Sequence, residues 1–416
     1  MFGYLTTFFG NPNVLLVIKG LYYSSPVWLT FILLMVAWNL WITYARAKYI
    51  ASQDYVLLEI KLPKEIFKSP LSMEFLFNML HQGFGEEKLK MKFDRWPPVI
   101  KNDYYWKGSV RPWTSLEICA INGKVRFFIW GRAGNRGAIE AQLYSQFPGI
   151  EVTPTTDYTL PISYDTNKYS FWVRELELTK ADPFPLKTYI DYGMDKDPKE
   201  EYRIDPLTPL IEFLGSLPAN QTVWIQIGIT AHKKTDKDPK TGKDIDKKWE
   251  VGAQEEIQKI LDKAKPPKPK EGETPTSAPR SLTKGEGEVI AALERSISKR
   301  GFDTGIRLFY FAPKDVFNQG YSGGVIAGFT HLNSNNLNGF KPRDEKHYDK
   351  DWKKSEQLHA YKNRGFFWNE FKTQTFVLNT EELATIYHFP SGALGSTTAV
   401  DRIESRKAEA PANLPQ

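Results

Sequence analysis

Two glycine-rich stretches carry residue types that could do chemistry. The first, Gly320–Gly324 (GYSGG), satisfies the G-x-S-x-G pattern of a nucleophile elbow, in which a serine occupies a sharp turn between a strand and a helix. That turn requires a buried strand directly before it, but the preceding residues Pro313–Gln319 are mostly polar and begin with proline. The pattern therefore favours a glycine-rich loop. An enzyme that uses Ser322 as its nucleophile is the alternative.

The second stretch, Gly131–Gly137 (GRAGNRG), lies between a predicted strand and a predicted helix. Backbone N–H groups at a helix N-terminus, with Arg132 and Arg136 beside them, could bind an anion. The glycine spacing matches neither the P-loop nor the dinucleotide-binding fingerprint, and the chain contains no G-x-x-x-x-G-K-[ST] pattern. A β-to-α turn that needs glycine where the backbone bends is the simpler interpretation.

Metal and thiol chemistry have little support in the sequence. The six histidines include no pair spaced four residues apart, and Cys119 is the single cysteine, so the usual zinc-ligand patterns are missing. Carboxylates are abundant but are scattered among lysines. We therefore expect no catalytic residue, no cofactor and no metal ion, and a protein that is not an enzyme.

The apolar stretch Pro26–Tyr44 (PVWLTFILLMVAWNLWITY) predicts a transmembrane helix at residues 26–45. No charged residue occurs between Lys19 and Arg46, and at about 1.5 Å rise per residue this interval can cross a hydrocarbon layer of about 30 Å. A buried core helix of a soluble protein is the alternative. The residues expected to anchor the helix in the bilayer are Trp28, Phe31, Leu34, Trp38, Trp41, Arg46 and Lys48.

Positive charges predict the orientation of this helix. Five lysines and arginines follow it closely, whereas Lys19 and the terminal amine alone precede it, so the positive-inside rule places the bulk of the chain in the cytoplasm and the N-terminus outside. Residues 1–25 are apolar but are interrupted by Asn11-Pro12-Asn13. We expect an interfacial segment there, with a tight hairpin of two spans as the alternative.

The remainder of the 416-residue chain, with 25% charged residues overall, is typical of globular protein and long enough for two domains. Residues 49–160 show the order strand, helix, strand, strand, helix, strand, which predicts a first ferredoxin-like domain. Asn122-Gly123 between the second and third strands is a strong hairpin signal. The expected elements are Tyr55–Leu62, Ile66–Leu80, Ser115–Asn122, Lys124–Trp130, Ala138–Phe147 and Ile150–Thr153.

A second ferredoxin-like domain is predicted at residues 161–400, which makes the fold class α+β. Residues 231–300 would be a long insertion with a flexible middle, because Pro266–Pro279 cannot bury enough apolar surface to become ordered, and Gly287–Arg300 at its end looks helical. Residues 401–416 would form an extended tail. The other expected elements are Lys168–Leu178, Leu207–Leu217, Thr222–Thr230, Gly305–Ala312 and a return through Lys314–Asn333 towards Thr375–Leu378.

A basic, aromatic loop suggests an alternative function, that of a membrane-tethered protein that binds single-stranded nucleic acid. Aromatic rings that stack on bases and cations that follow phosphates are the combination that such binding requires. The net charge of +6 is compatible with a nucleic-acid or a lipid partner but demonstrates neither. The candidate residues are Trp96, Tyr104, Tyr105, Trp106, Arg111 and Trp113.

Several C-terminal motifs resemble a known family. Asn335–Pro342 (NNLNGFKP), Phe376–Thr385 (FVLNTEELAT), Tyr387–Pro390 (YHFP) and Glu404–Pro415 are similar to the uncharacterised membrane-anchored N-terminal region of bacterial type IV secretion coupling-protein-like proteins, which act in conjugative DNA transfer. The stretches Tyr55–Pro63 and Gly305–Pro313 look like the same family, so the resemblance covers most of residues 54–415.

The resemblance implies a cytoplasmic docking platform that serves a P-loop ATPase or a secretion-channel protein, and it makes a homo-oligomer plausible. In longer relatives the ATPase follows the leucine-proline tail, whereas this sequence stops at Gln416. The motor would then be a separate polypeptide, lie outside the given sequence or not exist in this system. From the residues themselves, Thr380 predicts the cap of a helix Thr380–His388 that ends before Pro390. The expected docking residues are Thr380, Glu381, Glu382, His388, Phe389, Pro390, Leu414 and Pro415.

Overall fold

The computed structural model divides the chain into two compact units. The first contains Met1–Gln53 and Glu87–Val110, and the second contains Asp54–Glu86 and Arg111–Gln416. The structure describes residues 12–63, 68–83, 106–195, 205–232, 236–237, 244–245, 249–264, 281–344, 346–367, 374–390 and 400.

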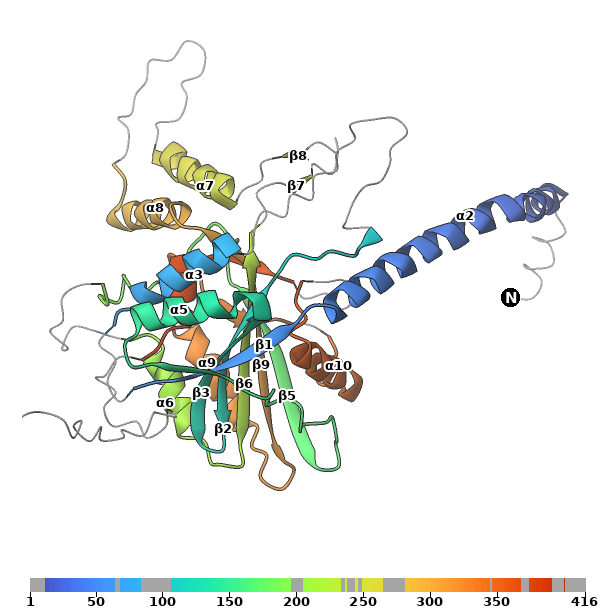
Figure 1. Ribbon diagram of the computed structural model, residues 1–416. Coiled ribbons are helices and arrows are strands. Elements are labelled where there is room, and N and C mark those ends of the chain that lie inside the picture. Colours follow the sequence, from blue (N-terminus) through green and yellow to red (C-terminus); the bar gives the residue numbers. More distant parts are fainter. Residues whose placement is uncertain are drawn as a thin grey trace, which may run out of the picture. The chain divides into compact units, whose positions relative to one another are not determined.

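The first unit is built on one long helix, α2 (Pro12–Ala51) (Figure 1). Pro12 suits the first turn of a helix, where a backbone N–H has no intrahelical partner. The helix continues through Pro26, which cannot donate to the carbonyl oxygen of Tyr22. The hydroxyl of Ser25 donates to that oxygen instead, at 2.6 Å. Residues 12–25, predicted as part of a separate interfacial segment, therefore belong to the same helix as residues 26–45.

The part of α2 from Tyr22 to Ala51 could span a membrane. It is 30 residues long, and its most apolar 18-residue stretch has a mean hydropathy of 1.7 and contains no buried residue. At about 1.5 Å per residue its length is about 45 Å, more than a hydrocarbon layer of about 30 Å requires. Length and composition thus agree with the predicted membrane helix, while its orientation stays a prediction.

The second unit contains one large antiparallel sheet in the order β10-β5-β9-β6-β2-β3-β1-β4, with β11 also paired to β9 (Figure 1). The predicted α+β class is confirmed at this level. The strands are β1 (Tyr55–Lys61), β2 (Thr114–Ile121), β3 (Lys124–Arg132), β4 (Glu151–Pro154), β5 (Tyr169–Leu178), β6 (Thr222–Ala231), β9 (Gly301–Pro313), β10 (Phe340–Pro342) and β11 (Phe376–Asn379), while β7 (Asp236–Lys237) pairs separately with β8 (Asp244–Ile245).

The sheet consists of two halves joined at their edges. In one half the chain order is β1, α3, β2, β3, α5, β4 and the spatial order is β4-β1-β3-β2. The other half has the spatial order β10-β5-β9-β6, and β2 pairs with β6 from Thr114↔Ile229 to Ala120↔Val223. The helices of this unit are α3 (Leu71–Gly83), α5 (Arg136–Gln146), α6 (Thr208–Gly215), α7 (Trp249–Ala264), α8 (Lys284–Ile297), α9 (Gly320–Thr330), α10 (Asp351–Lys362) and α11 (Thr380–Ile386).

Strand alternation gives the sheet two covered faces. Alternate apolar residues of the strands pack with α3, α5, α6, α9 and α11 in the larger core. The residues between them, including Cys119, Phe128 and Trp224, pack with Tyr348 and with Leu358 and Tyr361 of α10 in a second core. Because both faces are covered, the central strands are buried along almost their whole length.

Two sequence predictions have clear outcomes here. Asn122 and Gly123 both have positive φ, 53° and 74°, as the tight hairpin between β2 and β3 requires. Residues 375–378, in contrast, do not form the outer strand of the second half. That position is taken by β10, which pairs with β5. The long strand β9 pairs with β5 from Ile306 to Pro313 and with β11 from Gly301 to Thr304, so both partners fit along one side of it.

The predicted flexible insertion, residues 231–300, contains two helices. α7 and α8 pack against each other, and α8 begins with a capping box between Thr283 and Glu286. Trp249 of α7 and Leu293 of α8 are buried. The described part of the insertion therefore consists mainly of these two helices, preceded by the short strand pair β7 and β8, while Pro266–Pro279 lies outside the described residues.

Candidate functional site

The candidate site lies where β11 turns into α11. Asn379 is the last residue of β11 and has an extended conformation, with φ −85° and ψ 173°. Its side-chain oxygen accepts the N–H of Glu382 at 2.9 Å, and its own N–H donates to the Glu382 carboxylate at 2.8 Å. This reciprocal capping box makes Asn379 the N-cap. The prediction that Thr380 caps the helix is therefore wrong by one residue, because Thr380 is already helical.

Glu382 also connects α11 to a distant part of the chain. Its second carboxylate oxygen accepts the backbone N–H of Leu186 at 2.7 Å, so one buried side chain satisfies two backbone donors. Burial raises the pKa of Glu382 to about 8, and the nearby carboxyl groups of Glu381 and Asp182 act in the same direction. The two N–H bonds oppose this shift but are outweighed.

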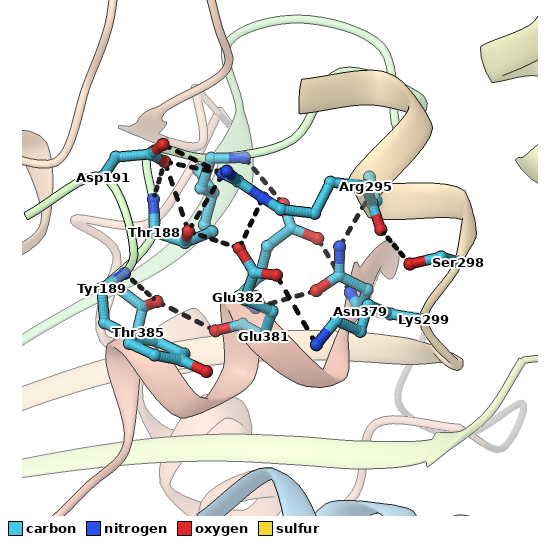
Figure 2. Close-up of polar contacts among 12 residues, drawn as sticks. Thr188, Tyr189, Asp191, Arg295, Ser298, Lys299, Asn379, Glu381, Glu382 and Thr385 are labelled. Carbon is cyan, nitrogen blue, oxygen red and sulfur yellow. Dashed lines mark hydrogen bonds and ion pairs between the residues drawn. The ribbon is translucent and has the colours of Figure 1, made fainter. Parts of the chain in front are cut away.

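Glu381 is the acceptor at the centre of an ionic junction (Figure 2). One carboxylate oxygen lies 3.1 Å from Nε of Arg295 and accepts the Thr188 hydroxyl, and the other lies 3.8 Å from Nζ of Lys299. Arg295 also donates to Asp191 at 3.0 Å. Burial raises the pKa of Glu381 even though Thr188 and the two cations lower it.

Glu74 of α3 extends the junction. Its carboxylate accepts Nζ of Lys299 at 2.9 Å, the Thr380 hydroxyl at 3.3 Å and the hydroxyl of Tyr189. The junction therefore joins α3, α8, α11 and the segment 186–191. Glu74, Glu381 and Glu382 are buried, whereas the side chains of Asp191, Arg295 and Lys299 are 27%, 32% and 26% exposed.

Chemically, this junction is suited to holding chain segments together. Opposite charges at hydrogen-bonding distance in a partly buried setting neutralise one another, and a general base or nucleophile would need to be accessible to a substrate. The buried carboxylates face backbone donors and cations of the same chain. Solvent reaches the junction on the side of Arg295 and Lys299.

Most of the predicted docking residues lie inside the protein. Thr380, Glu381, Glu382, His388, Phe389 and Pro390 are all buried. Nε2 of His388 lies 3.1 Å from Oδ1 of Asp205, and the ring of Phe389 packs edge-on against those of Phe127 and Phe147. These side chains expose no surface for a partner. Leu414 and Pro415 lie outside the described residues.

Two of the residues predicted to bind nucleic acid, Arg111 and Trp113, are engaged within the sheet domain. Arg111 donates to Asp303 at 3.1 Å and to the carbonyl of Ala231 at 2.7 Å, so its guanidinium is used within the sheet domain. Trp113 is buried beside the rings of Tyr55 and Trp130. Trp106 is exposed but belongs to the first unit. Trp96, Tyr104 and Tyr105 lie outside the described residues.

The predicted membrane-anchoring residues all lie on α2. The side chains of Trp28, Phe31, Leu34, Trp38 and Trp41 are exposed along the helix, as contact with lipid requires. Arg46 is half-buried, and Lys48 is exposed in the last turn.

Sequence reasoning missed a polar row on the second face of the sheet. Glu175, Arg307, Gln226 and Glu117 are register partners in sequence across β5, β9, β6 and β2. Arg307 donates to Glu175 and to Gln226 at 3.1 Å each, and Gln226 donates to Glu117 at 3.2 Å. A signal existed, because each of these strands carries a polar residue within an apolar run.

Both ends of the row are closed by arginines from the segment that precedes β11. Nε of Arg364 donates to Glu117 at 3.0 Å, and Arg343 donates to Glu175 at 3.3 Å. Arg364 also pairs with Asp157, and this partner outweighs burial and holds the pKa of Asp157 below its ordinary value. The row thus fastens Arg343 and Arg364 to the central strands.

The two glycine-rich stretches have structural roles. Ser322 lies in the first turn of α9, is buried, and donates to the carbonyl of Gln319 at 2.7 Å. β9 ends at Pro313, so no strand leads directly into Ser322 and the elbow geometry is not formed. Gly131–Gly137 is the predicted β-to-α turn between β3 and α5. Among the described residues, no group of His, Cys, Asp and Glu side chains is arranged to hold a metal ion.

No protein-family model matches the sequence, and no curated protein matches it. The likeness to secretion coupling proteins therefore depends on the sequence stretches quoted above.

Proposed function

We propose that this protein is a membrane-anchored, non-enzymatic scaffold that docks or assembles a partner ATPase in a bacterial type IV secretion or conjugative DNA-transfer machine. The observation that supports it best is the order of its parts. The apolar helix α2 ends at Ala51, and the sheet domain begins at Tyr55 with β1. Such a short connection ties the domain to the membrane if α2 crosses it.

The charged clusters on the two faces of the sheet support the scaffold role. In the ionic junction and in the polar row, carboxylates pair with arginine or lysine from distant segments of the same chain. Paired, buried charges of this kind fix the relative positions of helices and strands. They are less suited to catalysis, which needs groups that reach a substrate.

We further propose that each half of the sheet is a ferredoxin-like unit. Both halves have the βαββαβ order in which the first strand lies between the third and fourth. Their outermost strands, β4 and β10, have four and three residues. Short edge strands disfavour pairing with another sheet, so we expect partners and further copies to bind through side-chain surfaces instead.

The proposed membrane orientation is tested first with cysteine labelling. Gly20→Cys and Ala47→Cys place a thiol at exposed positions on either side of the apolar interval, in a Cys119→Ala background. A membrane-impermeant maleimide should label Gly20→Cys in intact cells and Ala47→Cys only after permeabilisation. Equal labelling of both positions in intact cells would contradict the anchored arrangement.

The docking role is tested by affinity purification from native membranes in detergent, with co-purifying proteins identified by mass spectrometry. An unrelated single-pass protein with the same tag is the control. Specific enrichment of a P-loop ATPase or secretion-channel protein is the expected result. Recovery of the chain without either would leave a membrane-anchored protein but reject the secretion machine.

A further inference from the structure

Trp106 lies beside two tryptophans of α2, although they are more than 60 positions apart in the sequence. Its ring centroid is 6.0 Å from that of Trp38 and 5.9 Å from that of Trp41, and both contacts are edge-to-face. Trp41 in turn lies 6.1 Å from Tyr44. Aromatic rings from two chain segments therefore gather at one level of the helix, and Trp106 remains 51% exposed.

A close backbone contact holds Trp106 in this place. Gly108, two residues further on, has φ +67°, and a Cβ built on it would lie 2.2 Å from the backbone of Ala45. Ala45 is one turn beyond Trp41 and is buried. Gly108 has no side chain and Ala45 has only a methyl group, so the segment that contains Trp106 can lie directly on the backbone of α2.

The level of this aromatic cluster matches one boundary of a bilayer. Tyr22 and Tyr23 are exposed nearer the other end of α2. Tyr23 and Trp41 are 18 positions apart, which at about 1.5 Å per residue is about 27 Å and close to the thickness of the hydrocarbon layer. Tryptophan and tyrosine favour the headgroup depth on both sides of a membrane.

Basic residues adjoin the same cluster. Lys107 follows Trp106, and Arg46 and Lys48 follow Tyr44 in α2. Cations just outside an aromatic belt are attracted to anionic headgroups. Water is a poor surrounding for exposed indole rings grouped in this way, whereas the headgroup region accepts both the apolar ring and its N–H.

We propose that Trp106 is a second membrane anchor, which inserts its indole ring into the headgroup region of an anionic bilayer beside Trp38 and Trp41. This proposal rests on the proposed membrane span of α2. It assigns Trp106 to lipid instead of to the stacking of nucleic-acid bases.

The test measures tryptophan emission of the full-length protein in vesicles of phosphatidylcholine and phosphatidylglycerol whose chains are brominated either near the headgroup or near the methyl end. The contribution of one residue is the difference between wild type and a Trp→Phe variant. Trp106→Phe reports on the proposed anchor, and Trp28→Phe reports on α2. Trp352→Phe is the control, because Trp352 is 59% exposed on α10 in the second unit.

We expect bromine near the headgroup to remove more of the Trp106 emission than bromine near the methyl end. The Trp352 emission should be insensitive to both lipids and quenched by iodide in solution. If Trp28 responds to brominated lipid while Trp106 behaves like Trp352, the membrane span stands and the second anchor is refuted. If neither Trp28 nor Trp106 responds, both the span and the second anchor are refuted.

Discussion

Arg307 and Glu175 lie opposite each other on β9 and β5, and the guanidinium of Arg307 donates to the Glu175 carboxylate at 3.1 Å with both side chains buried. The pair forms one end of a row that runs through Gln226 to Glu117. Such a pair adds little net stability compared with apolar residues of the same size, but it leaves an uncompensated charge if one partner is removed. The row is therefore better understood as a device that fixes strand register.

This relationship predicts a large loss of stability in the variant Arg307→Met. Glu175 would lose its nearest buried cation and Gln226 would lose a donor, so we expect the free energy of unfolding to fall by about 3–5 kcal/mol. Urea denaturation of the detergent-solubilised protein measures the change. Arg136→Met is the matched control, because Arg136 pairs with Glu140 on the exposed side of α5, where such pairs contribute about 0.3–0.5 kcal/mol. Equal losses in the two variants would contradict the proposed role of the row.

A second prediction concerns Gly228 and Gly305, which are register partners on β6 and β9. Cβ atoms built on them would lie 2.3 Å and 2.5 Å from the ring of Phe366, which covers both positions. Arg307 in turn lies over that ring, 4.4 Å from its centroid. Gly305→Ala should therefore displace Phe366 and lower the free energy of unfolding by about 1–3 kcal/mol.

Gly287→Ala is the control for this substitution. Gly287 lies in α8, and nothing beyond its chain neighbours and the backbone of its own helix lies within 4 Å of an added Cβ, so alanine there should stabilise the protein by up to about 1 kcal/mol. Combining Gly305→Ala with Phe366→Ala tests the cause, because removal of the ring removes the overlap. If Gly305→Ala lowers the free energy of unfolding equally in the presence of Phe366 and in the Phe366→Ala background, overlap with the Phe366 ring is not the cause of the destabilisation.

Much of the sheet could be predicted from local patterns. The runs of β2, β6 and β9 are apolar and β-branched, and Asn122-Gly123 identifies the hairpin, so these elements were located within a few residues. The pairing of β2 with β6, which merges the two halves, has no local signal. The pairing of β5 with β10, and not with residues 375–378, also has no local signal. It depends on how far the long strand β9 extends past β5.

The candidate site shows a different limit of sequence reasoning. Thr380, Glu381 and Glu382 look like the exposed first turn of a helix, and helical structure was predicted correctly there. Their burial depends on Leu186, Arg295 and Lys299, which lie far away in the chain and supply donors to the carboxylates. Polar residues are buried when such partners are present, and only the tertiary fold supplies them.

A third prediction tests whether Lys299 fastens α8 to the core. Lys299 donates to the buried carboxylate of Glu74 and lies near that of Glu381. Lys299→Met should lower the free energy of unfolding by about 1–3 kcal/mol, because hydrogen bonds to charged groups are stronger than neutral ones. It should also increase hydrogen exchange in α8. Lys259→Met on α7 removes an exposed pair with Glu256 and should leave α8 unchanged. Unchanged exchange of α8 in the Lys299 variant would show that apolar packing alone holds it.

A fourth prediction follows from the raised pKa of Glu382. The folded pKa of about 8 lies above the ordinary value of 4.5, so between these pH values the folded protein binds a proton that the unfolded chain does not bind. The contribution of this carboxyl to stability is therefore complete below about pH 4.5 and is lost as the pH rises towards 8. Because one pKa unit corresponds to about 1.4 kcal/mol, the loss is on the order of a few kcal/mol.

Glu382→Gln separates this titration from the hydrogen bonds. The amide has one oxygen, so it can accept from Leu186 or from Asn379 but not from both, and the unmatched N–H should cost about 1–3 kcal/mol at low pH. The variant no longer titrates at this position, so its deficit relative to wild type should shrink as the pH rises from about 5 to about 8. Glu288→Gln, at an exposed position of α8, should follow the wild-type profile. If the free energy of unfolding of wild type and of Glu382→Gln changes with pH in parallel, the pH dependence belongs to another group. A deficit that grows only as the pH rises to about 4.5 and is constant above it would mean that the two backbone donors hold Glu382 in its ionised form, with its pKa below the ordinary value.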